Sequence, residues 1–125
     1  MDIIVDIHSW VRWLVLLALV GGAVLGFVRS NRGEPWNDGP FTFAVIVVDV
    51  QVLLGIIVWI FNSGWDAGFF FAVLHPLFML LALGIAHMGL VRARKLDEPR
   101  SNLIMAWSLV ASLVLVIMAV PWDRL

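Results

Sequence analysis

A few ionisable or amide side chains interrupt the long apolar stretches of this sequence, and their types could support chemistry. They are Arg12, Asp49, Gln51, His75 and His87, with His8 at the edge of the first apolar stretch. In the middle of a membrane span, an Arg or Asp costs on the order of 2.5–3.5 kcal/mol on insertion scales. A purely structural bundle does not need such groups, so they are the candidates for a functional site.

His8 and His75 stand near the starts of two stretches that are expected to cross the membrane in the same direction. Their imidazoles are therefore expected at one depth, where they could ligate one metal ion from opposite sides. Imidazole suits iron, copper and zinc. The chain has no cysteine, and the nearby carboxylates are only the flanking Asp2, Asp6 and Asp66, so a tetrahedral zinc site lacks ligands. A haem iron needs only two axial side chains, and the pair therefore predicts a haem site.

Four further residues are candidates for contact with such a cofactor. Arg12 lies one turn after the first histidine and could neutralise a haem propionate, although it could also extend to the membrane surface. Gly22 and Gly26 form a small-xxx-small motif that lets a neighbouring helix or a flat macrocycle approach closely. Gln51 shares a helix face with Gly55, one turn later.

Asp49 and His87 form a second candidate polar site. His87 lies twelve residues after His75, which places it roughly 18 Å farther along a helix and rotates it by about 120°. The two histidines therefore cannot bind one ion. Asp49 is expected at a depth comparable to that of His87. The pair could serve a second cofactor, a proton or a quinone, but a polar pair that locks two helices together is the favoured interpretation.

The elements that must position these residues are membrane spans. Of 125 residues, 62% are hydrophobic and only 14% are charged, and mean hydropathy is +1.01, unlike a soluble domain. This composition excludes a soluble globular protein, a disordered chain and a nucleic-acid binder. Four stretches reach the length needed to cross a bilayer as a helix, at about 10–28, 41–61, 69–91 and 103–120. We therefore expect an all-α integral membrane protein, with residues 1–125 forming a single four-helix transmembrane domain.

The distribution of cations predicts the orientation of this bundle. Six of the eight basic residues lie in the first and third linkers, namely Arg29, Arg32, Arg92, Arg94, Lys95 and Arg100. Because cytoplasmic loops are rich in Lys and Arg, we expect an up-down-up-down bundle, N-out/C-out, in the inner (plasma) membrane. The start of the chain lacks the basic region of a signal peptide, so the first span is expected to be retained.

Three short motifs carry a resemblance to known families. They are His8-Ser9-Trp10-Val11-Arg12-Trp13, Gln51-Val52-Leu53-Leu54-Gly55 and His75-Pro76-Leu77-Phe78-Met79. In this order the chain resembles small four-helix bacterial membrane cytochrome b-like proteins, and it is similar to one half of haem A synthase, whose two four-helix bundles carry paired histidine ligands. The resemblance implies haem b held by His8 and His75. It does not imply haem A synthesis, because this chain has one bundle, no Glu near its first histidine and no cysteine pair.

Together, these residues and the resemblance predict a bis-His membrane cytochrome that carries electrons rather than acting as a catalyst. We expect a homodimer or a subunit of a larger redox assembly in the lipid bilayer, with a quinone near Asp49 and His87 as a further candidate partner. Two alternatives stay open. One is a cofactor-free subunit that packs against, or helps assemble, a membrane complex. The other is a membrane protein that handles haem or copper.

Overall fold

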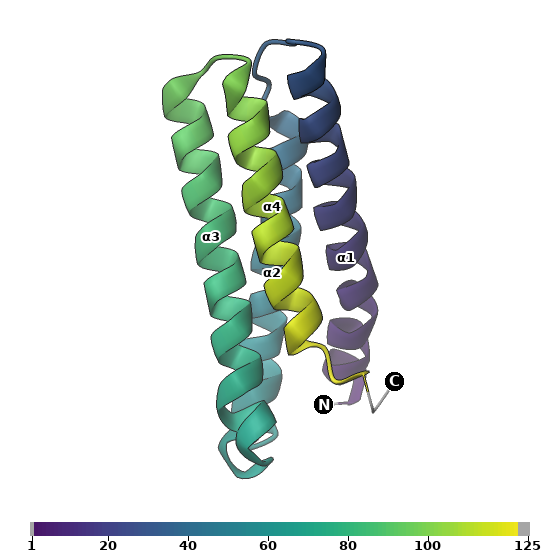
Figure 1. Cartoon of the computed structure of the whole chain (residues 1–125). Coiled ribbons are helices and arrows are strands. Elements are labelled where there is room, and N and C mark those ends of the chain that lie inside the picture. Colours follow the sequence, from purple (N-terminus) through teal and green to yellow (C-terminus); the bar gives the residue numbers. More distant parts are fainter. Residues whose placement is uncertain (1, 123–125) are drawn as a thin grey trace.

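The protein folds as four long helices joined by short connections (Figure 1), and the computed structural model describes residues 2–122. The helices are α1 (Asp2–Asn31), α2 (Gly39–Phe61), α3 (His75–Leu96) and α4 (Arg100–Ala119). A short 3₁₀ turn, η1 (Gly64–Asp66), and a π-helical turn, η2 (Phe70–Leu74), lie between α2 and α3. The all-helical class that the sequence predicts is confirmed for the described residues.

All four helices are long and apolar enough to cross a membrane. The qualifying segments are Ile3–Asn31, Gly39–Phe61, Phe70–Leu96 and Arg100–Ala119. Most of them extend beyond the apolar stretches, because backbone hydrogen bonds continue a helix after its side chains turn polar. The largest difference is in α1, which begins well before His8. His8 therefore lies inside a helix and not at its opening.

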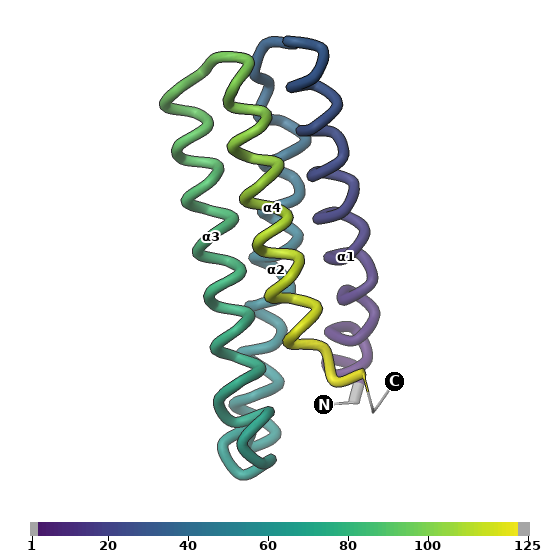
Figure 2. The backbone as a smooth tube through the Cα atoms, in the orientation of Figure 1, coloured from purple at the N-terminus to yellow at the C-terminus, as the bar shows by residue number. Residues whose placement is uncertain are grey.

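The helices surround a common axis with α1 and α3 on opposite sides. Both α1 and α3 pack against α2 and against α4, and the backbone trace in Figure 2 shows α2 and α4 between them. The start of α1, the end of α4 and the 62–69 connection lie at one end of the molecule, and the 32–38 and 97–99 connections lie at the other (Figure 1). Side chains from α1 and α3 can therefore meet across the centre of the bundle.

Small residues allow α1 and α4 to pack closely. A Cβ added at Gly26 would lie 2.8 Å from the Cβ of Ala106, and one added at Gly22 would lie 2.7 Å from Leu109 Cδ1. Gly26 leaves no room for a side chain, because the backbone oxygen of Asn102 would also lie 2.8 Å away, whereas at Gly22 the end of the Leu109 side chain would have to move. The small-xxx-small motif of the sequence thus brings two helices together, which is one of the two roles expected for it.

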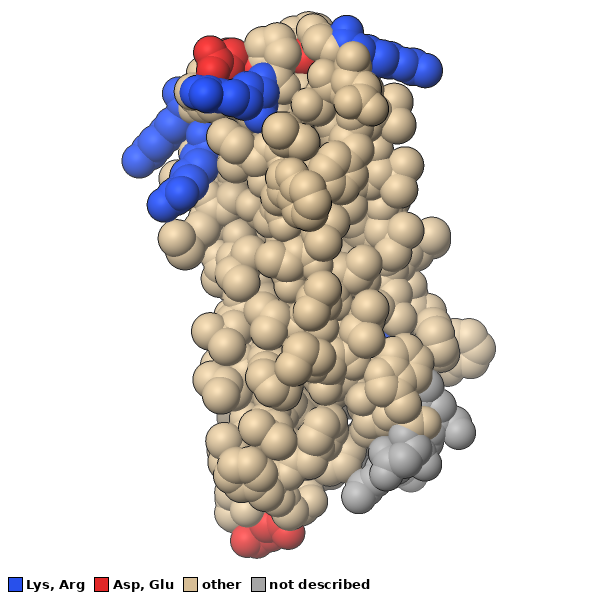
Figure 3. All heavy atoms as spheres, in the orientation of Figure 1, with Lys and Arg blue, Asp and Glu red and all other residues tan. Residues whose placement is uncertain are grey.

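The outer surface is apolar along its length and charged at its ends. Large exposed hydrophobic side chains occur on every long helix, including Trp10, Leu17, Leu53, Phe61, Leu80, Met88, Trp107 and Met118. Lys and Arg side chains gather at the end that carries the 32–38 and 97–99 connections (Figure 3). An apolar belt of this kind suits lipid rather than water.

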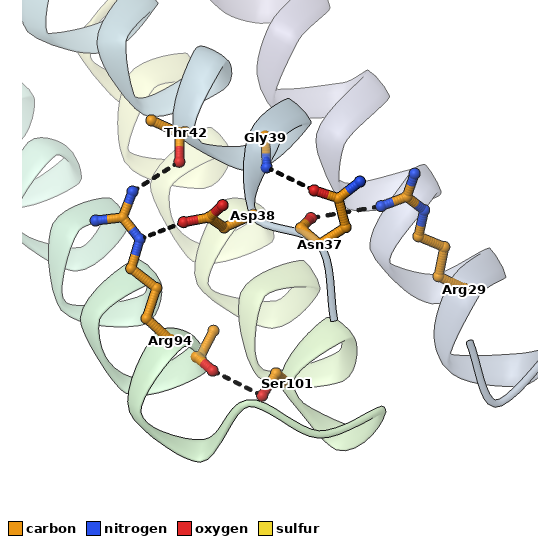
Figure 4. Close-up of polar contacts among 8 residues, drawn as sticks. Arg29, Asn37, Asp38, Gly39, Thr42, Arg94 and Ser101 are labelled. Carbon is orange, nitrogen blue, oxygen red and sulfur yellow. Dashed lines mark hydrogen bonds and ion pairs between the residues drawn. The ribbon is translucent and has the colours of Figure 1, made fainter. Parts of the chain in front are cut away.

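Polar contacts tie the helices together at the cation-rich end (Figure 4). Arg94 of α3 donates to the Asp38 carboxylate at 2.6 Å and to the Thr42 hydroxyl at 2.8 Å, both near the start of α2. Deeper in the bundle, the Ser112 hydroxyl of α4 donates to the carbonyl oxygen of Ala82 in α3 at 2.9 Å. The Arg94 contacts therefore link α2 and α3 at the cation-rich end, and the Ser112 contact links α3 and α4 deeper in the bundle.

Candidate functional site

His75 is held by the end of α4. Its ring Nδ1 lies 2.7 Å from the carbonyl oxygen of Ala119, the last residue of that helix. The final carbonyls of a helix have no partner within it, so this oxygen is free to accept a hydrogen bond. Because a carbonyl only accepts, Nδ1 carries the proton and donates. The lone pair of Nε2 is then available to a metal, in the arrangement that histidine ligands usually adopt.

The backbone before His75 is shaped by Pro76. Proline has no N–H and its ring crowds the carbonyl four residues earlier, which here belongs to Ala72. The preceding turn is π-helical, and such a turn makes room for one extra residue in a continuous helix. Trp59 Nε1 donates to the carbonyl oxygen of Phe71 in this turn at 3.1 Å. Pro76 therefore stands in the first turn of α3, directly after the π-helical turn, and this widened turn sets the position of His75.

His8 lies against a glycine on α2. A Cβ added at Gly55 would lie 3.0 Å from Cε1 of the His8 ring and 3.6 Å from Nε2. Gln51, one turn earlier on α2, donates from its Nε2 to the backbone carbonyl of His8 at 2.9 Å. Gly55 thus provides the space for the ring, and Gln51 fixes the level of α1 beside it.

The structure brings the rings of His8 and His75 close together between α1 and α3, in a T-shaped arrangement. Their ring centroids are 6.3 Å apart and the ring planes are at 90°. With a metal–nitrogen bond of about 2.0 Å and about 1.1 Å from nitrogen to ring centre, two opposite imidazole ligands have centroids about 6.2 Å apart. The observed separation therefore matches the separation needed for one ion between two imidazoles.

Two cavities meet at these histidines. The central cavity, about 510 Å³, is lined by residues of all four long helices, and the lateral cavity, about 470 Å³, lies between α2 and α3. Six residues line both of them: His8, Gln51, Gly55, Trp59, His75 and Met79. Most of the other lining residues are apolar, and cofactor sites commonly have volumes of about 300–1,000 Å³. Space for a large and mainly apolar group is thus present beside His8 and His75.

Three polar atoms at the central cavity are buried without a hydrogen-bond partner. They are His8 Nδ1, Arg12 Nε and Gln51 Oε1, and a fourth such atom in the described residues, Asn102 Oδ1, belongs to α4 outside both cavities. An unsatisfied buried polar group typically costs about 1–3 kcal/mol. Their gathering at one cavity indicates a site built for a bound group.

Arg12 gives this site a positive charge. It lines the central cavity one turn from His8, and its guanidinium carbon lies 5.0 Å from the ring centre of Trp13. No carboxylate of the described residues forms an ion pair with it. The side chain is therefore available to an anionic group of a ligand, such as a carboxylate.

The remaining candidate residues lie elsewhere. Gly22 and Gly26 line neither cavity and instead pack against α4. Asp49 and His87 come together, with Oδ1 and Nε2 at 2.7 Å, as a link between α2 and α3. Neither Asp49 nor His87 lines the central or the lateral cavity. The pairing of Asp49 with His87 that the sequence suggests is therefore present, and it is separate from the His8–His75 site.

Two features of the site were missed from the sequence. The Ala119 carbonyl that orients His75 carries no side-chain signal, and only the Pro121 that follows α4 hints that this carbonyl is free. Trp59 lines both cavities and donates to a carbonyl of the π-helical turn, a role that its position in the sequence does not indicate.

Between residues 2 and 122, no group of three or more His, Cys, Asp or Glu side chains is arranged to hold a metal ion. Comparison of the chain with family models, with curated proteins and with solved structures found no match.

Proposed function

We propose that this protein is a bis-His membrane cytochrome that binds haem b between His8 and His75 and transfers electrons. The observation that carries this proposal is the convergence of two imidazoles, 6.3 Å apart, on cavities that also hold three unpartnered polar atoms. A porphyrin provides its own four equatorial nitrogens, so two side-chain ligands suffice. The likeness of the His8, Gln51 and His75 motifs to those of small cytochrome b-like proteins and of one half of haem A synthase supports the same assignment.

The residues of the chain would have separate tasks in this function. A bis-His haem b supplies a one-electron iron couple without an open coordination position. His75, oriented by the Ala119 carbonyl, and His8, resting on Gly55, present the ligand nitrogens. Arg12 offsets negative charge on the bound group. The apolar walls exclude water, and the rigid helices keep both ligands in place through a change of charge.

We further propose an up-down-up-down bundle with both termini outside, in the inner (plasma) membrane. The gathering of cations at the end with the 32–38 and 97–99 connections supports this orientation (Figure 3). The His8–His75 site would then lie near the outer surface and exchange electrons there. A partner assembly, with a quinone among the candidate reactants, would provide the other half of the reaction.

An absorption spectrum of the purified protein tests this proposal. We expect a Soret band and sharp α and β bands on reduction. We expect His8→Ala and His75→Ala each to remove this low-spin spectrum, and the matched control His87→Ala to keep it. A colourless wild-type protein after expression with ample haem would refute the proposal and favour a cofactor-free subunit. Rapid loss of haem to an apo-acceptor would instead favour haem handling.

A further inference from the structure

A polar pair lies on the outside of the bundle, about halfway along α2. Asp49 is the eleventh of the 23 residues of α2, about 15 Å from the start of that helix. Its carboxylate accepts from, or pairs with, Nε2 of His87 at 2.7 Å, yet the His87 and Asp49 side chains remain 48% and 38% exposed. Ionisable groups at this depth normally face the interior of a bundle or a protein partner, because lipid cannot solvate them.

The pair retains unused hydrogen-bonding capacity toward the outside. One oxygen of Asp49 is bonded to His87, and within the described chain the second oxygen has no partner. In the ion-paired form the His87 ring carries a proton on both nitrogens; Nε2 donates to Asp49, and the described residues provide no acceptor for the N–H of Nδ1. The surface thus presents a carboxylate acceptor on α2 and a ring N–H donor on α3, level with each other.

The surroundings of the pair allow another helix to approach. Gly84 lies on α3 one turn before His87, and a Cβ added there would meet no atom within 4 Å. Exposed apolar side chains continue the same face above and below the pair: Ile46 and Leu53 on α2, and Leu81, Met88 and Val91 on α3. We call these residues, with Asp49, Gly84 and His87, the α2–α3 face. It combines a small-residue notch with polar groups, the two features of transmembrane helix interfaces.

We propose that the α2–α3 face binds a second copy of this chain around a two-fold axis along the membrane normal. Such an axis places α2 of each copy against α3 of the other, so that Asp49 faces the partner's His87 and His87 faces the partner's Asp49. The face is therefore complementary to itself in charge and hydrogen bonding. The second copy also shields the α2–α3 seam, in which the lateral cavity opens, from lipid. This proposal does not depend on the haem.

Crosslinking in the membrane tests the arrangement, and the absence of native cysteine makes single-cysteine variants specific. Copies carrying Leu53→Cys and copies carrying Gly84→Cys, with tags of different size, are expressed together and treated with a short bismaleimide. We expect a mixed crosslinked dimer. The matched control is Gly21→Cys on α1, since position 21 is equally open, and copies carrying it should not crosslink to Gly84→Cys copies.

Exchange of the polar residues tests the chemistry of the interface. Asp49→Ala with His87→Ala should weaken dimerisation about tenfold, since two symmetric contacts are lost, while Asp49→His with His87→Asp should restore it. Circular dichroism and monomer elution show that the variants fold. A wild-type chain that stays monomeric, equal crosslinking from position 21, or crosslinking only to a different protein would overturn the proposal.

Discussion

Replacement of Gly55 by alanine should lower the affinity for haem without lowering the stability of the apo protein. The two measurements together therefore distinguish an effect on the site from an effect on the helix. The new Cβ would lie 3.0 Å from Cε1 of His8, closer than ordinary contact, so the ring must shift by a few tenths of an ångström. Crowding of this kind typically costs about 1–3 kcal/mol. We expect this cost in the ligand-bound state, because a ring that ligates iron is held in place and cannot shift. Haem affinity should then drop about 5- to 150-fold. Alanine also favours a helix over glycine by about 1 kcal/mol, so the apo protein should not lose stability.

Titration of the apo protein with haem, followed by the Soret band, measures the affinity, and thermal melting of apo samples measures stability. Gly21→Ala is the matched control, since position 21 is on a spanning helix with no atom within 4 Å of an added Cβ and lies outside the α2–α3 face; it should leave haem affinity unchanged. If Gly55→Ala binds haem as tightly as wild type, the position of the His8 ring does not depend on this glycine, and the proposed role of Gly55 in making space for the ring is wrong.

Three further substitutions test other parts of the account. Arg12→Met keeps the apolar stem of the side chain and removes its charge. Haem affinity should fall about tenfold, as expected for loss of a charge-assisted hydrogen bond. An unchanged affinity in the same titration would exclude an anion-binding role for Arg12. Gln51→Leu removes the bond to the His8 carbonyl at 2.9 Å; it should broaden or shift the low-spin spectrum while His75 still binds, and an identical spectrum would contradict a positioning role. Ser112→Ala removes the bond to the Ala82 carbonyl and should lower the free energy of unfolding by about 0.6 kcal/mol without a spectral change, so altered haem spectra would place Ser112 in the site instead.

The meeting of His8 and His75 could be predicted from the sequence because it depends on coarse properties. Four apolar stretches with short linkers make the first and third helices run in the same direction, and a histidine near the start of each then lies at the same level. The pairing of Asp49 with His87 follows from the same reasoning about depth. Neither prediction requires knowledge of side-chain packing.

Other parts of the site depend on packing and could not be predicted. Glycine spacing at Gly22 and Gly26 shows that something approaches closely, but it does not distinguish a helix from a macrocycle; the structure places α4 there. The carbonyl of Ala119 becomes a partner for His75 only because α4 ends at that level. The start of α1 could not be predicted either, because the helix begins at Asp2, several residues before the apolar stretch.

Carbon monoxide binding to the reduced protein tests the central claim most directly. If His8 and His75 both ligate the iron, no coordination position is open, so the wild-type Soret band should not move under carbon monoxide. The same treatment should shift the band in any haem that His75→Ala retains. A wild-type band that shifts at once would contradict ligation by two histidines.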